Sequence, residues 1–371
     1  MILVLNAGSS SVKYRLVDGA ATAAHGVVER IGEPGSPVAD HAAALRMVAG
    51  AVQAGNRDVT AVGHRVVHGG SRFTEPTLID DAVVAGIRAL IPLAPLHNPA
   101  CAAGIDAARG LWPGVPQVAV FDTAFHATIP AAAATYAIDA GLAGAYGIRR
   151  YGFHGTSHRY VSRRTADLLG RAPTELNLIV LHLGNGASAC AVAGGRSVET
   201  SMGFTPLEGL VMGTRSGDLD PGVVFHLARA AAMTLDEIEG SLQHRAGLAG
   251  LSGDNDMRTV LARAAAGDVA ARLAIDVYCH RIRKYIGAYH AVLGRLDAIA
   301  FTAGVGENSP DIRAEVANGL AALGIHIDPE RNAGGDTPRV ISPDSSSVAV
   351  CVVPTDEELE IAEQVVQAVA G

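Results

Sequence analysis

Residues 1–18 constrain the fold of this chain more than any other segment, because they place a polar turn between two strand-like runs. Residues 2–5 are continuously apolar, as in a buried strand, and residues 12–16 alternate apolar with polar side chains, as in a half-buried strand. The turn at residues 6–11 contains three serines, and Lys13 follows it. Backbone N–H groups, hydroxyls and an ammonium can converge here on an anion, without the strand–loop–helix arrangement of common nucleotide loops. Ordinary turn chemistry explains the same residues, so the segment alone leaves both interpretations open.

The same pattern returns in residues 178–192, where an apolar run, a turn and a second apolar run follow one another. Asn185 and Gly186 in this turn are a strong signal for a tight hairpin. Because the two segments are alike, we predict a duplicated α/β fold in which each half presents a strand–turn–strand phosphate grip to one cleft.

Two further apolar runs end in polar or glycine-rich turns, and helical stretches alternate with the strands. The runs are residues 118–121, before Asp122, and residues 298–301, before the turn at 302–308. Ligands of α/β sheets bind at the carboxyl ends of strands, so both turns are candidate site elements. Helices are predicted at residues 80–90, 157–169 and 268–292, and a last helix with a capping box formed by Thr355 and Glu358.

The composition fits a compact two-domain enzyme. The chain has 371 residues, 49% hydrophobic and 18% charged, so it can bury a sizeable core and is unlike a disordered chain. A net charge of −8 argues against general nucleic-acid affinity. The four cysteines are scattered without a CxxC pair, which predicts buried thiols in a reducing cytoplasm rather than disulfides or a zinc site. We also expect neither a signal peptide nor a membrane span.

Two arginines and two histidines lie in turns where they can meet an anionic substrate: Arg65, Arg215, His154 and His97. A guanidinium forks onto carboxylate or phosphate, and an imidazole stabilises charge on a transferring phosphoryl group. Taken singly, surface ion pairs also explain the arginines, and loop capping explains the histidines.

Asp122 and Glu357 are the candidate metal-binding acids, because each follows an apolar run and Mg²⁺ prefers oxygen ligands. Both have an alternative explanation, since Asp-Thr commonly starts a turn and an acid in the first turn of a helix is stabilised by the macrodipole. His154 and His158 have the spacing of a helical zinc pair, but no glutamate adjoins His154 and no cysteine is near, which disfavours metal-peptidase chemistry.

Together these segments resemble the acetokinase (acetate kinase) family of phosphotransferases over residues 1–370. Both family signatures are present, at residues 3–14 and at residues 202–215, which end in Met-Gly-Thr-Arg. The resemblance implies an α/β fold of duplicated ribonuclease H-like (actin-like ATPase) domains facing a central cleft. The implied domains are an N-terminal one, residues 1–125 plus 358–371, and a nucleotide-binding C-terminal one, residues 126–357.

The resemblance also implies a role for each candidate residue. Asp122 matches the essential active-site acid, His154 and Arg215 match transition-state stabilisers, Arg65 matches the substrate-binding arginine, and His97 matches a further active-site histidine. Asn6 and Glu357 match the metal-associated positions, and Lys13 matches a phosphate contact. The apolar pocket for the acetate methyl group matches Val67, Leu96, Phe153 and Pro206. The nucleotide contacts fall on His182, Leu183, Gly184, Asn185 and Gly186, on Asp256, Met257 and Arg258, and on Gly304, Val305, Gly306, Glu307 and Asn308.

The implied reaction is the reversible, in-line transfer of the γ-phosphoryl group of ATP to acetate, giving acetyl phosphate and ADP, with Mg²⁺ or Mn²⁺ as the metal. A homodimer is implied as well. Two alternatives stay open: a propionate or butyrate kinase of the same superfamily, and a non-catalytic nucleotide-binding switch, since chaperones and filament proteins share the fold. The set Arg65, Asp122, His154 and Arg215 favours catalysis, and Phe153 and Pro206 favour the smaller acid.

Overall fold

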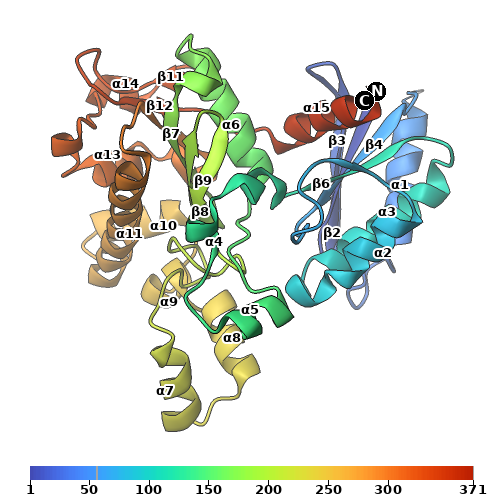
Figure 1. The fold of residues 1–371 in the computed structure, drawn as a ribbon, viewed down its shortest axis with the longest axis horizontal. Coiled ribbons are helices and arrows are strands. Elements are labelled where there is room, and N and C mark those ends of the chain that lie inside the picture. Colours follow the sequence, from blue (N-terminus) through green and yellow to red (C-terminus); the bar gives the residue numbers. More distant parts are fainter. Residues whose placement is uncertain (56, 371) are drawn as a thin grey trace. The chain divides into compact units, whose positions relative to one another are not determined.

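A computed structural model describes residues 1–55 and 57–370, and the chain divides into two compact units (Figure 1). The first unit comprises Met1–Ala127, Phe153–Ser157 and Asp356–Gly371, and the second comprises Thr128–Gly152 and His158–Thr355. The domain limits expected at residues 125 and 357 stay a prediction. The expected N-terminal domain includes Asn56 and Gly371, which lie outside the described residues.

The first unit is built on a mixed six-stranded sheet with the strand order β3-β2-β1-β4-β6-β5. β1 and β2 form the predicted hairpin, and β3 extends it in antiparallel pairing. β1, β4 and β6 are parallel neighbours, and β5 pairs antiparallel with β6. The strands are β1 Ile2–Ala7, β2 Ser11–Asp18, β3 Ala21–Glu29, β4 Ala61–Val66, β5 Thr77–Leu78 and β6 Gln117–Phe121.

Helices cover both faces of this sheet, because successive side chains of β1 point to opposite faces. Leu3 and Leu5 pack in a core with residues of α1 and α3. Val4 packs on the other face with Ile361 and Val365 of α15, which lies along β4 and β6 (Figure 1). The helices of this unit are α1 His41–Ala54, α2 Asp81–Ala89, α3 Asn98–Leu111 and α15 Glu357–Ala370, with 3-10 turns at Ile91–Leu93 and Ala124–Thr128.

The second unit repeats this sheet strand for strand, with the order β11-β12-β10-β7-β8-β9. β7 and β8 form the second predicted hairpin, β9 extends it, β7, β10 and β12 are parallel neighbours, and β11 pairs antiparallel with β12. Every strand thus has a counterpart in the first unit, in the same chain order, which confirms the predicted duplication. The strands are β7 Asn177–Leu183, β8 Ala187–Ala193, β9 Arg196–Thr200, β10 Ala298–Thr302, β11 Arg339–Val340 and β12 Ala349–Val352.

The long helix α11 organises the core of the second unit. It buries Ile275, Ile282 and Ile286 on one side and packs on β8, whose residues are almost all buried. α6 begins in the first unit and continues in the second. The helices are α4 Ala131–Ala134, α5 Ala140–Tyr146, α6 Gly155–Leu168, α7 Gly222–Ala230, α8 Leu235–His244, α9 Gly247–Ser252, α10 Met257–Ala265, α11 Val269–Leu293, α12 Ala303–Asn308, α13 Pro310–Ala317 and α14 Pro329–Ala333, with 3-10 turns at Pro173–Glu175 and Ala321–Leu323.

The start of the last helix differs from the prediction. The sequence predicted a capping box of Thr355 and Glu358, but α15 begins at Glu357, and Asp356 caps it by accepting the N–H of Leu359 at 3.0 Å. The prediction was wrong by one residue because an aspartate is a cap as good as threonine. The N–H of Thr355 donates instead to Glu307.

The cysteines behave as predicted. All four are buried thiols that form no disulfide bond. Burial raises the pKa of Cys190, Cys279 and Cys351 to about 12, which keeps these thiols protonated and unreactive.

Helix length and apolarity also bear on the membrane question. Within the described part of the chain, no helix combines the length and apolar character needed to cross a bilayer.

His64 in β4 makes a pH-dependent contribution to stability. Its side chain is buried, and its Nε2 lies 2.8 Å from Oε1 of Gln117. Burial lowers the pKa of His64 to about 4, and the hydrogen bond to Gln117 opposes that shift only in part. The unfolded chain takes up the proton near pH 6.5. The stability contributed by the neutral imidazole is therefore complete above pH 6.5 and is lost as the pH falls toward 4.

We expect this residue to lower the free energy of unfolding by about 2 kcal/mol between pH 7.5 and pH 5. Urea unfolding at several pH values measures it, for the parent chain and for His64→Asn, whose side chain does not titrate. The variant should show the flatter dependence on pH. Equal slopes in the two proteins would show that burial of neutral His64 is not the cause.

Candidate active site

Neighbouring strands of the first unit bring Arg65 and Asp122 together. Arg65 lies near the end of β4, and Asp122 directly follows β6, its parallel neighbour. Nε of Arg65 donates to Oδ1 of Asp122 at 3.0 Å, and Nη2 donates to Oδ2 at 2.6 Å. The side chain of Asp122 is 2% exposed and that of Arg65 is 20% exposed. Such a bidentate, charge-assisted pair fixes the plane of the guanidinium.

Glu357 and Thr156 join this pair. Glu357 is the first residue of α15, and its Oε2 lies 3.6 Å from Nε of Arg65. The hydroxyl of Thr156 donates to the same Oε2 at 3.2 Å. The sequence did not indicate a role for Thr156, because a threonine in the first turn of a helix is common. Thr156 also lies 201 residues before Glu357 in the chain, so no local pattern connects the two. The cluster of these four residues holds two carboxylates and one guanidinium.

Burial and ion pairing shift the pKa values of Asp122 and Arg65 in opposite directions. Burial raises the pKa of the Asp122 carboxyl, and Arg65 opposes that shift. Burial alone would lower the pKa of Arg65, but Asp122 and Glu357 outweigh it and hold the pKa above its ordinary value. Arg65 therefore stays protonated, and the two acids outnumber the one cation.

The donor chemistry of the cluster fits Mg²⁺. This ion takes one or two carboxylates, keeps several waters and binds substrate phosphates rather than sitting in an all-protein cage. Two carboxylates beside one arginine leave negative charge for a divalent cation. Throughout residues 1–55 and 57–370, no three or more His, Cys, Asp or Glu side chains gather where they could hold a metal ion.

Asn6 and Lys13 are directly opposite each other on β1 and β2, so their side chains share one face of the sheet. Val4 packs against α15, and alternation along β1 places Asn6 on the same face. Lys13 is exposed. The structure therefore brings these two predicted residues together, and their metal and phosphate roles stay predictions.

His154 stands in an uncommon backbone conformation beside the strand end that carries Asp122. Its φ is 57°, a left-handed value that is uncommon for non-glycine residues. The N–H of Gly155 donates to the carbonyl of Asp122 at 2.9 Å, and a Cβ on Gly155 would lie 2.2 Å from that oxygen. Only glycine fits there, so the close approach holds the start of α6 against β6.

Two of the predicted pocket residues and His97 belong to one region of the first unit. Val67 directly follows β4, and Phe153 is buried edge-on to His68, with ring centroids 5.6 Å apart. His97 precedes α3, and the next residue, Asn98, exchanges two hydrogen bonds with the backbone of His68. Of the other pocket residues, Leu96 is 56% exposed and Pro206 belongs to the second unit.

In the second unit, the turn after β7 is tied to the central signature. The turn closes with the N–H of Gly184 donating to the carbonyl of Gly186 at 3.0 Å. The carbonyl of Asn185 accepts the N–H of Gly213 at 2.9 Å, and a Cβ on Gly213 would lie 2.0 Å from the Asn185 side chain. Leu183 and His182 are buried in the strand before the turn. The glycine at position 213 is thus required by the close approach of the two loops.

The other two predicted nucleotide segments meet the same turn. Nδ2 of Asn255, next to Asp256, donates to Oδ1 of Asn185 at 3.3 Å. A Cβ on Gly184 would lie 3.7 Å from that of Ala303, the first residue of α12. Residues 182–186, 255–258 and 303–308 therefore converge in the second unit, as one ligand would require.

The residues of these segments differ in how they face solvent. Gly304 and Asn308 are exposed, and a Cβ on Gly304 would meet nothing within 4 Å, which leaves room for a ligand. Arg258 is paired with Asp256 at 2.6 Å and is 91% exposed. Met257 and Gly306 are buried, and Val305 and Glu307 are half-buried.

Arg215 and Pro206 are in contact. Nη1 of Arg215 donates to the carbonyl of Pro206 at 3.3 Å and lies 3.7 Å from the sulfur of Met212. Burial lowers the pKa of Arg215. Because both partners are uncharged, an anion arriving at this guanidinium would meet a largely uncompensated positive charge.

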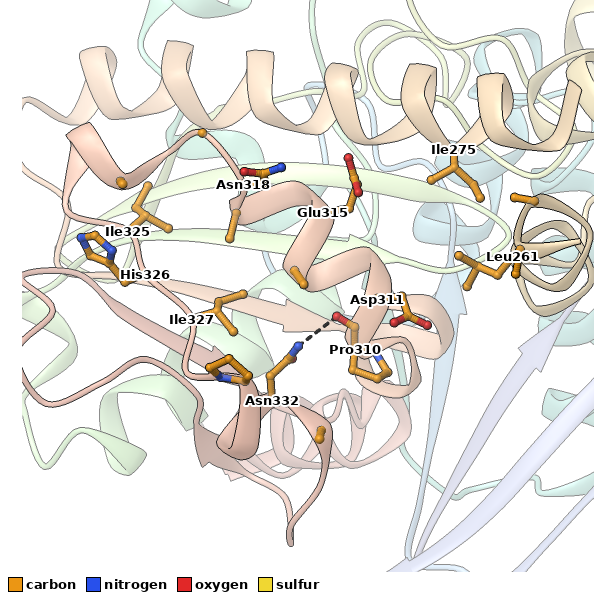
Figure 2. A pocket seen from close by; sticks show the side chains of 18 of the residues that line it. Leu261, Ile275, Pro310, Asp311, Glu315, Asn318, Ile325, His326, Ile327 and Asn332 are labelled. Atoms are coloured by element: carbon orange, nitrogen blue, oxygen red, sulfur yellow. Dashed lines mark hydrogen bonds between the residues drawn. The ribbon is translucent and has the colours of Figure 1, made fainter. Parts of the chain in front are cut away.

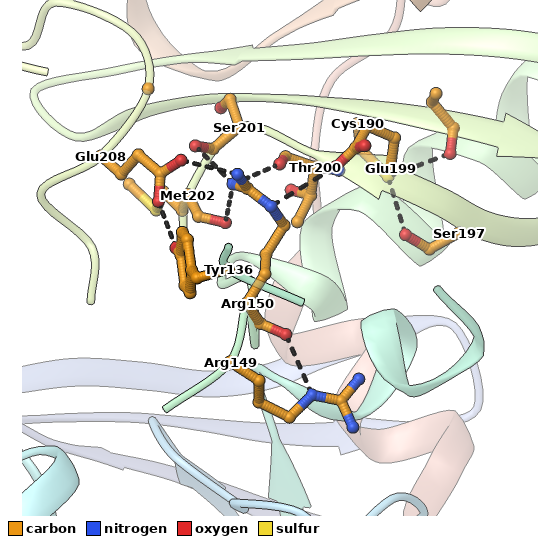
Figure 3. Close-up of polar contacts among 12 residues, drawn as sticks. Tyr136, Arg149, Arg150, Cys190, Ser197, Glu199, Thr200, Ser201, Met202 and Glu208 are labelled. Carbon is orange, nitrogen blue, oxygen red and sulfur yellow. Dashed lines mark hydrogen bonds and ion pairs between the residues drawn. The ribbon is translucent and has the colours of Figure 1, made fainter. Parts of the chain in front are cut away.

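Arg150 is a further residue of this loop region that the sequence did not indicate (Figure 3). Its Nη1 donates to the successive carbonyls of Thr200, Ser201 and Met202 at 3.0, 3.3 and 3.3 Å, and its Nη2 donates to Oε1 of Glu208 at 2.6 Å. Tyr136 donates to the other oxygen of Glu208. Arg150 thereby fixes the loop that leads from β9 to Pro206, a role that only the folded chain reveals.

A groove of about 1030 Å³ is lined by residues that follow two of the predicted nucleotide segments, beginning with Leu261 after residues 256–258 and with Pro310 after residues 304–308 (Figure 2). Its walls come from α10, which begins at Met257, from the start of α11, and from α13 and α14. Small and branched apolar side chains dominate, among them Leu261, Ile275, Ile325 and Ile327. Such walls suit a flat apolar group rather than a phosphate.

The model of the Acetokinase family matches residues 1–363 of this chain. An acetate kinase of Streptomyces avermitilis is 60% identical over 388 aligned positions, covering 98% of this chain and 96% of its own length. An acetate kinase of Leifsonia xyli is 57% identical, covering 100% of this chain and 99% of its own.

Solved structures give the same result for the fold. The crystal structure of Porphyromonas gingivalis acetate kinase has a TM-score of 0.95 with 40% identity, covering 99% of both chains. A propionate kinase from Francisella tularensis has a TM-score of 0.93 with 41% identity, also covering 99% of both chains. Both likenesses span the two units, so the duplicated fold read from the strand orders is the fold of these kinases.

Proposed function

Because this chain belongs to the acetokinase family, we propose that it is an acetate kinase, which transfers the γ-phosphoryl group of ATP reversibly to acetate and gives acetyl phosphate and ADP. The observation that carries the proposal is the 60% identity to an acetate kinase over nearly the whole chain. The partly buried cluster of Arg65, Asp122, Glu357 and Thr156 supports it, because a switch protein has no evident need for it.

The difficulty of this reaction is electrostatic, because an anionic carboxylate approaches an anionic phosphoryl group. Cationic and hydrogen-bonding groups must offset that repulsion and the charge on the equatorial oxygens. We assign Arg65 to the substrate carboxylate, and Arg215 and His154 to the transferring phosphoryl group. Arg215 suits this role because burial already disfavours its isolated charge, so an anion relieves that cost.

We propose Mg²⁺ as the divalent metal that the family requires, with Mn²⁺ as a substitute, and ATP or ADP as the nucleotide. Glu357 and Asn6 are the residues assigned to the metal. When bound, the ion supplies positive charge to the phosphate oxygens. Asp122 is assigned to positioning it and its waters rather than to proton transfer, since acetate is already ionised at neutral pH and no proton needs removing.

We assign the nucleotide phosphates to the turns His182–Gly186 and Gly304–Asn308 together with Lys13, and the nucleoside to Asp256–Arg258. The exposed Gly304 and the convergence of these segments support the assignment. His97 is assigned to the active site, and the groove beside α10 and α13 to the base end of the nucleotide.

Hydroxamate detection of acetyl phosphate, in a mixture of ATP, Mg²⁺ and acetate, tests the proposal directly. Product that depends on all three reagents is the expected result. A chain that binds ATP but forms no hydroxamate with any short carboxylic acid would instead be a nucleotide-binding switch.

Acyl chain length separates this function from that of its nearest rivals. Val67, Leu96, Phe153 and Pro206 are assigned to the methyl group, and one extra methylene in such an apolar site costs about 1–3 kcal/mol. We expect kcat/KM to fall by about tenfold or more from acetate to propionate and again to butyrate. The measurement is hydroxamate kinetics over the three acids. Equal kcat/KM on butyrate would overturn the assignment, and a preference for propionate would support a propionate kinase instead.

A cytoplasmic location and a homodimer complete the proposal, both supported by family membership. Sedimentation of the purified chain tests the second point, and a monomer at micromolar concentration would contradict it.

A further inference from the structure

The carboxylate of Glu307 is engaged by three donors of its own unit. Its Oε1 accepts the N–H of Ala303 at 2.7 Å, the N–H of Thr355 at 3.1 Å and the hydroxyl of Thr302 at 3.3 Å. Thr302 ends β10, Ala303 begins α12, and Thr355 follows β12. One oxygen atom therefore joins the carboxyl ends of two parallel strands to the first turn of a helix.

The turn that Glu307 holds is strained. Ala303 has a φ of 63°, a left-handed conformation that favours glycine and costs a side-chain-bearing residue free energy. Strain of this kind persists where surrounding contacts enforce it. The short, charge-assisted hydrogen bond from the N–H of Ala303 to Glu307 is such a contact.

The other end of α12 is fixed independently by Arg313. This side chain is 1% exposed and donates to the carbonyls of Gly306 and Glu307, both at 2.9 Å. It also donates to Oδ1 and the carbonyl of Asn332 at 2.7 and 2.8 Å. Asn332 in turn donates to the carbonyl of Pro310 (Figure 2). With that end secured, the position of the first turn of α12 depends on Glu307.

We propose that Glu307 is a positioning residue and not a nucleotide ligand. It holds the nucleotide turn, Gly304–Asn308, in register with Thr355, where the chain leaves the second unit two residues before the metal-associated Glu357. The inference rests on the proposed function, because it takes this turn as a nucleotide contact. Glu307 was predicted to contact the nucleotide, and the proposal gives it a positioning role instead. The exposed members of the turn, which can contact a ligand, are Gly304 and Asn308.

The proposal is tested by measuring the affinity for ADP by calorimetry in the presence of Mg²⁺. Acetate is left out, so no turnover takes place. Glu307→Ala should weaken ADP by about tenfold or more, because three donors lose a charged acceptor. Glu307→Gln keeps an acceptor oxygen and should stay within about threefold of the parent. Ala303→Gly added to Glu307→Ala should restore most of the affinity, because glycine adopts the left-handed turn without enforcement. Glu330→Ala, an exposed acid on α14, is the matched control and should bind like the parent.

A direct nucleotide contact predicts a different pattern. Ala303→Gly would then restore nothing, and Glu307→Gln would lose affinity almost as Glu307→Ala does; that result would overturn the proposal. If Glu307→Ala does not fold, Thr302→Val is used instead, because it removes one of the three donors at nearly constant volume. An ADP affinity that is unchanged both in Thr302→Val and in the double variant Glu307→Gln/Thr302→Val would also overturn the proposal. Failure of this proposal can be distinguished from failure of the proposed function. A parent chain that binds ADP but makes no acetyl phosphate would contradict the proposed function, and the binding series could still be measured on it.

Discussion

Arg65→Ala should abolish nearly all activity and also destabilise the fold. Removal of a group that stabilises transition-state charge costs about 10²–10³ in rate, and loss of the arginine that we assign to the substrate carboxylate should lower kcat/KM for acetate by about 10³ or more. The second effect follows from the buried pair, because Asp122 would face Glu357 without a cation. Breaking a buried ion pair on one side costs about 3–5 kcal/mol. Hydroxamate kinetics and urea unfolding measure the two effects separately.

Two further variants isolate the cause. Arg109→Ala removes an arginine of the same unit whose partner, Asp81, is 94% exposed, so its stability should change by about 1 kcal/mol or less. Asp122→Asn added to Arg65→Ala removes the unpaired charge and should recover much of the lost stability while activity stays low. If Arg65→Ala unfolds at the same urea concentration as Arg109→Ala, the buried pair contributes little to the fold.

The sheets were predictable because their signals are local. The runs at residues 2–5 and 178–183 are apolar enough to identify buried strands, and their likeness predicted the duplication that the strand orders confirm. β3 was not predicted, since Ala21–Glu29 is largely exposed and carries little periodicity. The cap of α15 was misassigned because Thr355 and Asp356 are both good caps, and only the tertiary contact of Thr355 with Glu307 separates them.

The sequence indicated candidate residues for the site, but it did not indicate how they are arranged. Arg65 was a candidate for the substrate, and Asp122 and Glu357 were candidates for the metal, whereas the structure joins all three residues, because strand pairing and helix packing bring distant segments together. The residues that were missed, Thr156, Arg150 and Arg313, act through neighbours that are far along the chain or through backbone carbonyls. The spacing of residues in a sequence does not indicate which backbone carbonyls accept hydrogen bonds from a guanidinium.

Asp122→Asn should lower kcat by about 10²–10³ and raise the Mg²⁺ concentration needed for half-maximal activity. An amide carries no charge and presents hydrogens where Nη2 of Arg65 donates, at 2.6 Å, so the variant loses metal attraction and disturbs the guanidinium. Activity titrations with Mg²⁺ at saturating acetate and ATP separate the two losses. Asp106→Asn is the matched control, since Asp106 pairs with Arg88 on the surface of the same unit and should leave both quantities unchanged.

The Mg²⁺ dependence decides what Asp122 does. Both of its oxygens already accept hydrogen bonds from Arg65, so a direct hold on the ion must use their remaining lone pairs or bound waters. A fall in kcat with an unchanged Mg²⁺ requirement would therefore mean that Asp122 acts by aiming Arg65 at the substrate, and the metal role would be abandoned. In that case Arg65→Ala and Asp122→Asn should be strongly non-additive in kcat/KM, because each removes the same function.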